Sequence, residues 1–464
     1  MNIDIINNLV KDNPDLKIRK LNINNKNILI IFFESLCSSV FINEYILYPI
    51  ENNKLNNYKK IIDKLPSSNK VDIKSKEELL LNLYSGFTII YVDNKFISFE
   101  TKERLNSDIS EASIEKTVNG PKDSFTENYQ TNLGLIRKRI RSDKLKVKEY
   151  TIGSTSKNKI SLLYMDNITN KKLVNDIDKK IKNINIDYVP NINYIVELIS
   201  KKNYTFPNYI MTERPDMASF SLTNGRIIIL LENTTKVLVL PAFFSDYIQN
   251  IDDYYQNTKN ISITRIIRLI AFLISILTPS LYIALTTFNP ETLPTSILIN
   301  FSIQRSGVPF PSIIEALILL ITFEILREAD TRTPTIASTS MSIVGAIVLG
   351  EAAVNAGLIS PIMIIVIAIS SISSFLFNDI DFVNSIRIWK IIILLLSSFL
   401  GLYGLFIGCL LFLITITSMN SFSFDYTLPV YPFSLKEQLN NLILTKKYKL
   451  NFRNKFLTKN KKRR

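Results

Sequence analysis

The hydrophobic positions divide the chain into two parts with different patterns. Before residue 257, short apolar runs alternate with charged and Asn-rich stretches, which is typical of a water-soluble domain. Between 266 and 417, long runs of Ile, Leu, Val, Phe and small residues dominate, as in helices that cross a lipid bilayer. The pattern predicts a multi-domain protein, in which an N-terminal soluble α/β head of two subdomains precedes an all-α polytopic membrane domain.

The first α/β subdomain is predicted over residues 14–103, after an N-terminal segment at 1–13. Apolar runs of strand length at 28–33 and 87–92 flank a stretch with helical spacing at 77–85. Alternation of strands and helices is typical of α/β domains, so we expect a sheet with at least one covering helix.

A linker at 104–120 leads to a second α/β subdomain, predicted over residues 121–256. It contains three strand-length apolar runs and one polar helical pattern, at 159–165, 226–231, 236–241 and 173–184 respectively. Thr234 and Thr235 lie between the last two strands, where a short turn would join them. We therefore expect these two strands to form a hairpin.

The membrane domain is predicted over residues 257–433 and contains five apolar runs of unequal length. A helix needs about 20 residues to cross the hydrocarbon core. The run at 313–326 is shorter than this and contains Glu315 and Glu324, so we expect a short interfacial or re-entrant helix there. The other four runs are predicted to span the membrane, at 266–288, 336–358, 359–377 and 388–417.

Basic residues determine the expected orientation of these spans. Arg265 and Arg268 precede the first span, and the basic tail at 434–464 follows the last. Because Lys and Arg accumulate on the cytoplasmic side, we expect the head and the tail to be cytoplasmic. An even number of crossings follows, and four crossings place the connection at 378–381 on the outer face.

The second and third spans are expected to form a hairpin with a tight turn at the cytoplasmic face. Gly357 can adopt the left-handed conformation after a helix, Ser360 can cap the next helix, and Pro361 fits its first turn. Small residues at spacings of four allow helices in lipid to approach each other closely. The candidate helix-packing residues are Ser338, Ser342, Ala346, Gly350, Gly404 and Gly408.

Glu351 lies within an otherwise apolar stretch, where a carboxylate costs roughly 3 kcal/mol to insert. On a helix it shares a face with Ser340, Ile347 and Asn355. Three interpretations stay open at this point. Glu351 could pair with a neighbouring helix, stay hydrated near the membrane surface, or border a water-filled path for cations.

The remaining composition argues against an enzyme. The chain has no histidine, and it has neither a phosphate-binding Gly-rich lysine loop nor a dinucleotide fingerprint, so we expect no catalytic site, cofactor or metal. The net charge of +14 is concentrated after the last apolar run, which favours membrane lipid and not nucleic acid as the partner. Glu213, Arg214 and Asp216 form a candidate interaction site of the head, although ion-paired charges at the start of a loop are the simpler interpretation.

Several sequence strings occur in one order along the chain and together resemble the A subunit of GerA-type spore germinant receptors. They include PKDSFTENYQTNLGLIRKRI, ERPD, GRIIILLEN, LVLPAFFSDYIQNIDDYY, READTRTP and SIVGAIVLGEAAVNAGLISP. The resemblance implies a multi-pass protein of the spore inner membrane, with its head and tail on the side of the spore core. It also implies a permease-like B subunit and a lipoprotein C subunit as partners.

In this family, the resemblance further implies a homo-oligomer, expected to be a pentamer, around a path for monovalent cations that germinant opens. Ser340, Ile347, Glu351 and Asn355 then become candidate pore-lining residues. A non-conducting signalling scaffold is the main alternative function, and a secondary transporter is a further one.

Overall fold

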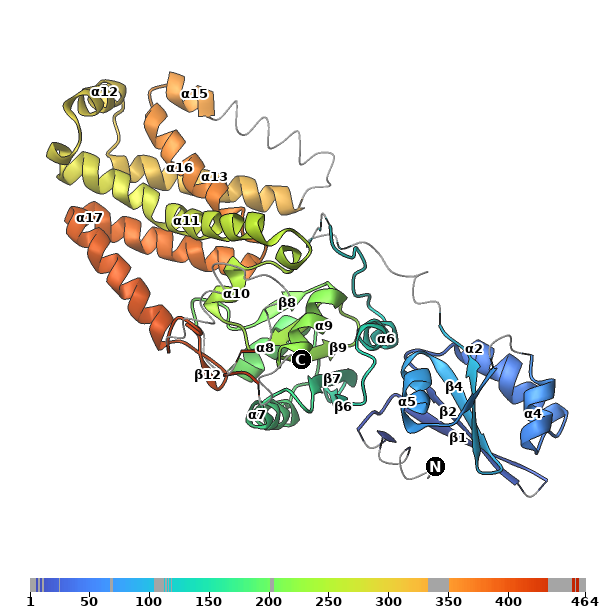
Figure 1. The fold of residues 1–464 in the computed structure, drawn as a ribbon. Helices are drawn as coiled ribbons and strands as arrows, with labels where there is room; N and C mark the ends of the chain where they lie inside the picture. The colour runs from blue at the N-terminus through green and yellow to red at the C-terminus, as the bar shows by residue number, and fades with distance from the viewer. Residues whose placement is uncertain are drawn as a thin grey trace.

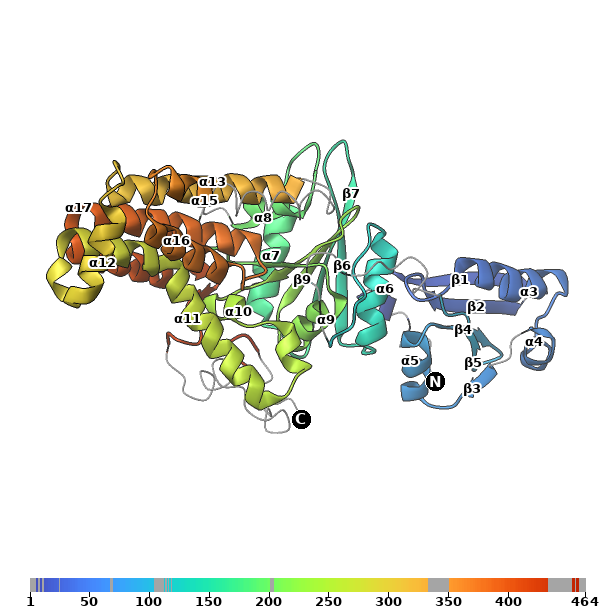
Figure 2. The same ribbon diagram turned by 90° about the horizontal axis from the view of Figure 1, so that it is seen from above.

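The computed structural model contains an N-terminal region with two β-sheets and a C-terminal region of helices (Figures 1 and 2). This arrangement confirms the predicted α/β head followed by an all-α region. The structure describes residues 6, 9–10, 12–24, 26–66, 70–103, 112, 115, 117, 119–200, 204–332, 350–432, 453–454 and 456–458.

The first sheet is antiparallel and has the strand order β1-β2-β4-β5-β3. Strands β2 and β4 at its centre are mainly apolar because both of their faces are buried: Ile30 and Ile90 belong to one hydrophobic cluster, and Ile31 and Ile89 belong to another. The strands are β1 (Leu16–Ile23), β2 (Lys26–Phe33), β3 (Lys70–Ile73), β4 (Phe87–Val92) and β5 (Lys95–Glu100). The helical segments are α2 (Ser39–Ile42), η1 (Asn43–Leu47), α3 (Tyr48–Asn52), α4 (Tyr58–Lys64) and α5 (Lys76–Tyr84).

The second sheet repeats this design with the order β6-β7-β9-β10-β8. β9 and β10 pair antiparallel, with Ile229 opposite Leu238, which confirms the predicted hairpin. The strands are β6 (Leu145–Ile152), β7 (Asn158–Met165), β8 (Ile210–Thr212), β9 (Ile227–Leu231) and β10 (Val237–Leu240). The helices are α6 (Tyr129–Arg139), α7 (Lys171–Lys182), α8 (Ile192–Ser200), α9 (Pro215–Thr223) and α10 (Phe244–Ile248).

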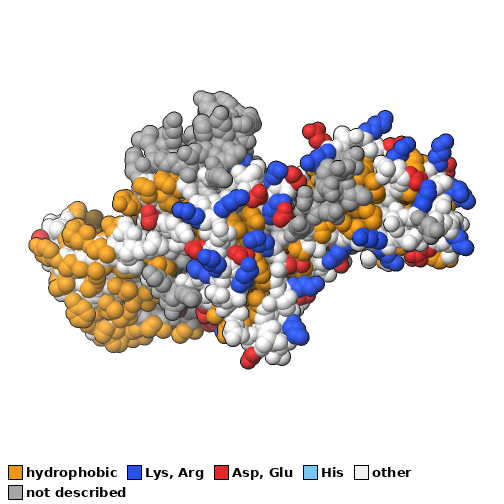
Figure 3. Space-filling view, turned by 90° about the horizontal axis from the view of Figure 1, so that it is seen from below, with side chains coloured by type: hydrophobic (Ala, Val, Ile, Leu, Met, Phe, Trp, Pro, Cys, Tyr) orange, Lys and Arg blue, Asp and Glu red, His pale blue; other side chains and the backbone are white. Residues whose placement is uncertain are grey.

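The helical region begins directly after the second sheet. Among the described residues, two helical segments, 258–288 and 380–418, are long and apolar enough to cross a membrane. Hydrophobic side chains gather on the surface of this region, whereas charged side chains cover the head (Figure 3). The elements are α11 (Thr258–Ile283), η3 (Ala284–Phe288), η4 (Pro290–Thr292), α12 (Thr295–Arg305), α13 (Ser312–Arg332), α15 (Gly350–Asn355), α16 (Pro361–Ser374) and α17 (Ile380–Ser418).

Two of these helices differ from the sequence-based expectation. α13 continues to Arg332, so it is longer than the short helix expected at 313–326. Its charged final turns still adopt helical geometry, in part because Arg332 pairs with Glu328 one turn earlier at 2.7 Å. α12 was not predicted, because Asn300 and Gln304 interrupt its apolar pattern.

α17 corrects the expectation of one straight span at 388–417. Gly401 has φ 60° and ψ −136°, and the helix reverses direction there into two antiparallel arms (Figure 1). A Cβ atom on Gly404 would lie 2.0 Å from the Leu396 carbonyl oxygen, and one on Gly408 would lie 3.0 Å from Ile393. These two glycines therefore face the other arm of their own hairpin.

The connection before α17 also corrects the predicted topology. The Tyr209 hydroxyl of the head donates to Asp381 at 2.8 Å, and Ser385 donates to the Thr205 carbonyl. Residues 378–381 thus lie on the same side as the head, not on the opposite face. Acidic residues say little about membrane orientation, and here the head supplies the partner of Asp381.

The turn after α15 has the expected backbone but the opposite location. Gly357 has φ +64°, and the amides of Gly357 and Leu358 donate to the carbonyls of Val354 and Ala353, which closes the helix. Ser360 occupies the N-cap position of α16 without a side-chain cap. The turn lies at the end of the helices away from the head, where α12 and α15 are found (Figure 1).

Candidate functional site

The junction between the head and the helices is built around two consecutive aspartates. Asp252 and Asp253 lie on the single-turn segment η2 (Ile251–Tyr254), directly before α11. Asn250 begins this turn, because its side chain accepts from the Asp252 amide and its own amide donates to Asp253. The sequence therefore places two carboxylates between the second sheet and the first long helix.

Asp252 is held by the head. The guanidinium of Arg214 donates to Asp252 at 2.7 Å, and it donates twice to Asp216, at 3.1 and 2.8 Å. Tyr255 adds a hydroxyl bond to Asp216 at 2.7 Å. Arg214 is only 2% exposed, so these charges are largely shielded from water.

Asp253 is held by the first long helix. Arg265 donates to it at 2.8 Å, and Arg268 donates through both terminal nitrogens at 3.0 Å. Arg265 and Arg268 are three residues apart on α11 and therefore share one face. From the sequence these arginines indicated only the membrane orientation of the first span. In the structure their ion pairs with Asp253 connect α11 to the head.

Glu213 connects this network to the segment between the two sheets. Its carboxylate accepts from the Glu115 amide at 2.8 Å, and the Glu115 carboxylate accepts from the Thr212 hydroxyl at 2.6 Å. Burial raises the pKa of the Glu115 carboxyl above its usual value. Glu213, Arg214 and Asp216 are all buried by contacts within the chain, which favours the simpler interpretation of ion-paired charges.

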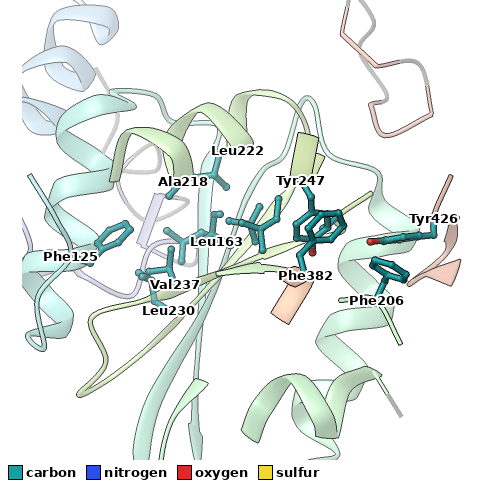
Figure 4. Packing of buried hydrophobic residues seen from close by; sticks show 14 of the residues in the cluster. Phe125, Leu163, Phe206, Ala218, Leu222, Leu230, Val237, Tyr247, Phe382 and Tyr426 are labelled. Atoms are coloured by element: carbon teal, nitrogen blue, oxygen red, sulfur yellow. The ribbon is translucent and has the colours of Figure 1, made fainter. Parts of the chain in front are cut away.

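An aromatic cluster continues the junction into the helices (Figure 4). The rings of Tyr247 from α10 and Phe382 from α17 stack with centroids 4.7 Å apart, and Phe206 lies 5.5 Å from Phe382. Trp389, from the first arm of α17, belongs to the same hydrophobic core. Head and helices thus share one core at this point, in addition to the ion pairs.

A cavity of about 500 Å³ lies beside the aromatic cluster, between the second sheet and the connection to α17. Lys236, Asp246 and Arg268 line it together with Asp379 and Asp381. Asp379 caps α17 by accepting from the Phe382 amide at 2.8 Å. Burial, opposed by that hydrogen bond and assisted by the nearby Asp381 charge, raises the pKa of Asp379 to about 6.

The candidate pore-lining residues are only partly described by the structure. Glu351 and Asn355 are exposed on α15, four residues apart. Within the described part of the chain, no residue forms an ion pair with Glu351. Ser340 and Ile347 lie outside the described residues, as do three candidate packing residues, Ser338, Ser342 and Ala346.

Sequence reasoning missed the role of a second carboxylate, Glu315. It is fully buried near the start of α13, where it accepts from the Ser360 amide at 2.9 Å and from the Ser360 hydroxyl at 2.8 Å. Arg305 lies 3.8 Å away. The signal that drew attention to Glu351, an acid within an apolar run, was equally present at Glu315.

No group of three or more His, Cys, Asp or Glu side chains that could hold a metal ion occurs among the described residues. The ion pairs of Asp252 and Asp253 connect the head to the apolar helices. This geometry could transmit a displacement, since Asp252 pairs with Arg214 of the head and Asp253 pairs with Arg265 of α11.

Comparison with known proteins identifies the family. The family model described as "Bacillus/Clostridium GerA spore germination protein" matches residues 4–456. The chain belongs to the GerA spore germination family. Spore germination protein KA of Bacillus subtilis (strain 168) is 34% identical over 436 residues, which cover 92% of this chain and 80% of that protein.

Other GerA family members show similar coverage. Spore germination protein GerQA of Bacillus cereus is 32% identical over 91% of this chain and 86% of its own length. Spore germination protein A1 of Bacillus subtilis (strain 168) is 32% identical over 95% of this chain and 92% of its own length. A crystal structure of the N-terminal domain of the A subunit of the Bacillus megaterium germinant receptor GerK3 is 26% identical, with a TM-score of 0.41 over 52% of this chain and 94% of that one.

Proposed function

We propose that this GerA family member is a membrane subunit of a nutrient-responsive spore germination receptor and oligomerises into a germinant-gated channel for cations. Family membership supports the receptor role. The observation that supports conduction is the exposure of Glu351 and Asn355 on α15 within an apolar sequence.

The energetic argument concerns what surrounds Glu351 in the membrane. Exposure of a carboxylate to acyl chains costs roughly 3 kcal/mol or more. Water or another subunit would remove this cost, and a ring of subunits would supply both. A ring of carboxylates beside a water-filled path attracts cations and repels anions.

The junction would link germinant binding to this path. A displacement of the head would move Asp252 through its ion pair with Arg214. The adjacent Asp253 would then move Arg265 on α11. Partner subunits that contact the head could therefore move the first long helix. In this proposal the partners are a permease-like B subunit and a lipoprotein C subunit, in a homo-oligomeric ring, expected to be a pentamer, of the spore inner membrane.

Replacement of Glu351 by Gln tests conduction directly. The variant and the wild type are reconstituted in liposomes with the partner subunits, and germinant-dependent release of K⁺ is measured together with oligomer size. We expect the same oligomer but reduced release and weaker preference for cations over anions. Glu291→Gln is the matched control, because Glu291 is an exposed carboxylate in η4 at the same end of the helices, and it should change neither quantity.

Two results would contradict the proposal. Unchanged cation release and selectivity in Glu351→Gln would remove Glu351 from the conducting path. Loss of the oligomer in the same variant would instead show that Glu351 holds subunits together.

A non-conducting signalling scaffold is the second candidate function, and the ion-paired junction favours it, since that network could pass a displacement onward without conduction. The wild-type complex distinguishes the two. Absence of cation flux with germinant and all subunits present would leave the scaffold as the better account.

A further inference from the structure

A cleft with basic and apolar walls lies between α13, α16 and α17, near the head. It has a volume of about 610 Å³, within the usual range of ligand sites. We call it the basic cleft and define it by Glu324, Arg327, Arg387 and Lys390, with apolar walls that include Leu320, Phe375 and Ile386.

Positive side chains outnumber negative ones among the described residues of the basic cleft. Glu324 is shared by two guanidiniums, with Arg387 at 3.0 Å and Arg327 at 3.5 Å. Arg327 and Arg387 also both donate to the side-chain oxygen of Asn384. Glu328 and Arg332, which pair with each other at 2.7 Å, also line the cleft, so four cations face two carboxylates among the described lining residues.

Lys390 is the most deeply buried cation of the basic cleft. It lines the cleft, is only 5% exposed, and forms neither a hydrogen bond nor an ion pair among the described residues. The Arg387 Nε atom is also buried without a hydrogen-bond partner. A buried ammonium is costly when its nearby carboxylate, Glu324, already pairs with two guanidiniums, so a bound anion would stabilise this arrangement.

We propose that the basic cleft binds the anionic headgroup of a phospholipid, with the phosphate at Lys390 and Arg387 and an acyl chain along the apolar wall. The position favours a lipid. Ser385, within one and a half turns of Lys390, contacts the head, so the charged end of the cleft lies where headgroups meet the membrane surface. Phosphate is a preferred ligand of Arg and Lys. A small anion would leave the adjoining apolar wall without a contact, whereas an acyl chain would cover it.

The segment that follows α13 supplies no counter-charge for Lys390. The segment after α13, from residue 333 to residue 349, contains no Asp or Glu. It could not neutralise Lys390 wherever it lies. The proposal requires insertion of the helices in a membrane, but it does not depend on ion conduction, so it can fail while the channel proposal holds.

Native mass spectrometry of the full-length protein tests the proposal. The protein is released from vesicles that contain phosphatidylglycerol or only phosphatidylcholine, and the retained lipid is counted. Wild type should retain phosphatidylglycerol selectively, whereas Lys390→Met should retain it about ten- to a hundredfold less, as expected for loss of a charged hydrogen bond. Lys390→Arg should preserve retention, because the charge and its hydrogen-bonding capacity remain.

Lys259→Gln is the matched control, because it removes an exposed lysine at the head-proximal start of α11, outside the cleft. Methionine preserves the length and apolar volume of the lysine stem, so Lys390→Met should fold; its circular dichroism without lipid should match the wild type, and its unfolding midpoint should be equal or higher because the buried charge is gone. If that variant nevertheless fails to fold, Arg387→Gln provides the same comparison.

Three outcomes would overturn the proposal. Equal retention of phosphatidylglycerol by Lys390→Met and Lys259→Gln would separate the lipid from the cleft. Displacement of the lipid by inorganic phosphate at equal concentration would show that the site takes a small anion. A change of oligomeric state in Lys390→Met, with lipid retention unchanged, would identify the cleft as an interface between copies of the chain.

Discussion

Removal of the Asp253 charge should loosen the attachment of α11 to the head. The carboxylate is 3% exposed and is the acceptor for Arg265, which is fully buried, and for Arg268. Asp253→Asn preserves the size of the side chain but removes the negative charge to which both guanidiniums donate. Loss of one partner of a buried ion pair costs about 3–5 kcal/mol, because the remaining charge stays desolvated.

The expected shift of the unfolding midpoint follows from this energy. The second sheet and the helices share one hydrophobic core, so we treat them as one cooperative unit. At about 2–4 °C per kcal/mol, Asp253→Asn should lower the midpoint by about 6–20 °C. The chain has a single tryptophan, Trp389, which is 5% exposed in this core and packs against Phe412 at 5.3 Å.

Tryptophan fluorescence during heating in detergent micelles is therefore a specific assay for the core at the junction. Asp166→Asn serves as the control, since Asp166 forms an exposed ion pair with Lys171 at 3.8 Å and such pairs contribute little. If Asp253→Asn unfolded at the same temperature as Asp166→Asn, the junction would not depend on the ion pairs and the reasoning would be refuted.

Two further predictions concern Asp379 and Gly401. The pKa of Asp379 is raised to about 6 in the folded protein, above that of an unfolded Asp, so the folded state binds the proton more tightly. The free energy of unfolding should therefore rise by about 1 kcal/mol from pH 7 to pH 5. Asp379→Asn, which can still cap α17, should lack this part of the pH dependence in Trp389 fluorescence melts. Gly401→Ala should lower the unfolding midpoint, because Gly401 has a positive φ and a Cβ atom there would lie 2.7 Å from Phe288. Gly307→Ala should not lower it, since the Cβ position of Gly307 has open space around it. Equal midpoints of the two variants would show that the hairpin does not need glycine at position 401.

The sequence by itself determined the two classes of structure and the strands at the centre of each sheet. The runs at 28–33 and 87–92 are mainly apolar because both faces of the sheet are covered. Their amino-acid composition alone therefore indicates buried strands. The left-handed Gly357 was also predictable, since a helix end followed by Ser-Pro requires a residue that tolerates positive φ. Family membership followed from the order of several strings along the chain.

Only the tertiary structure decided which charges meet. Arg214 and Asp252 are far apart in sequence, and nothing in either local pattern indicates that one guanidinium bridges Asp216 and Asp252. The reversal of α17 was hidden for a related reason: Gly401 lies in an unbroken apolar run, and hydropathy does not distinguish a straight helix from a tight hairpin. Local patterns record burial and backbone preference, whereas pairing and direction depend on the three-dimensional packing of distant segments.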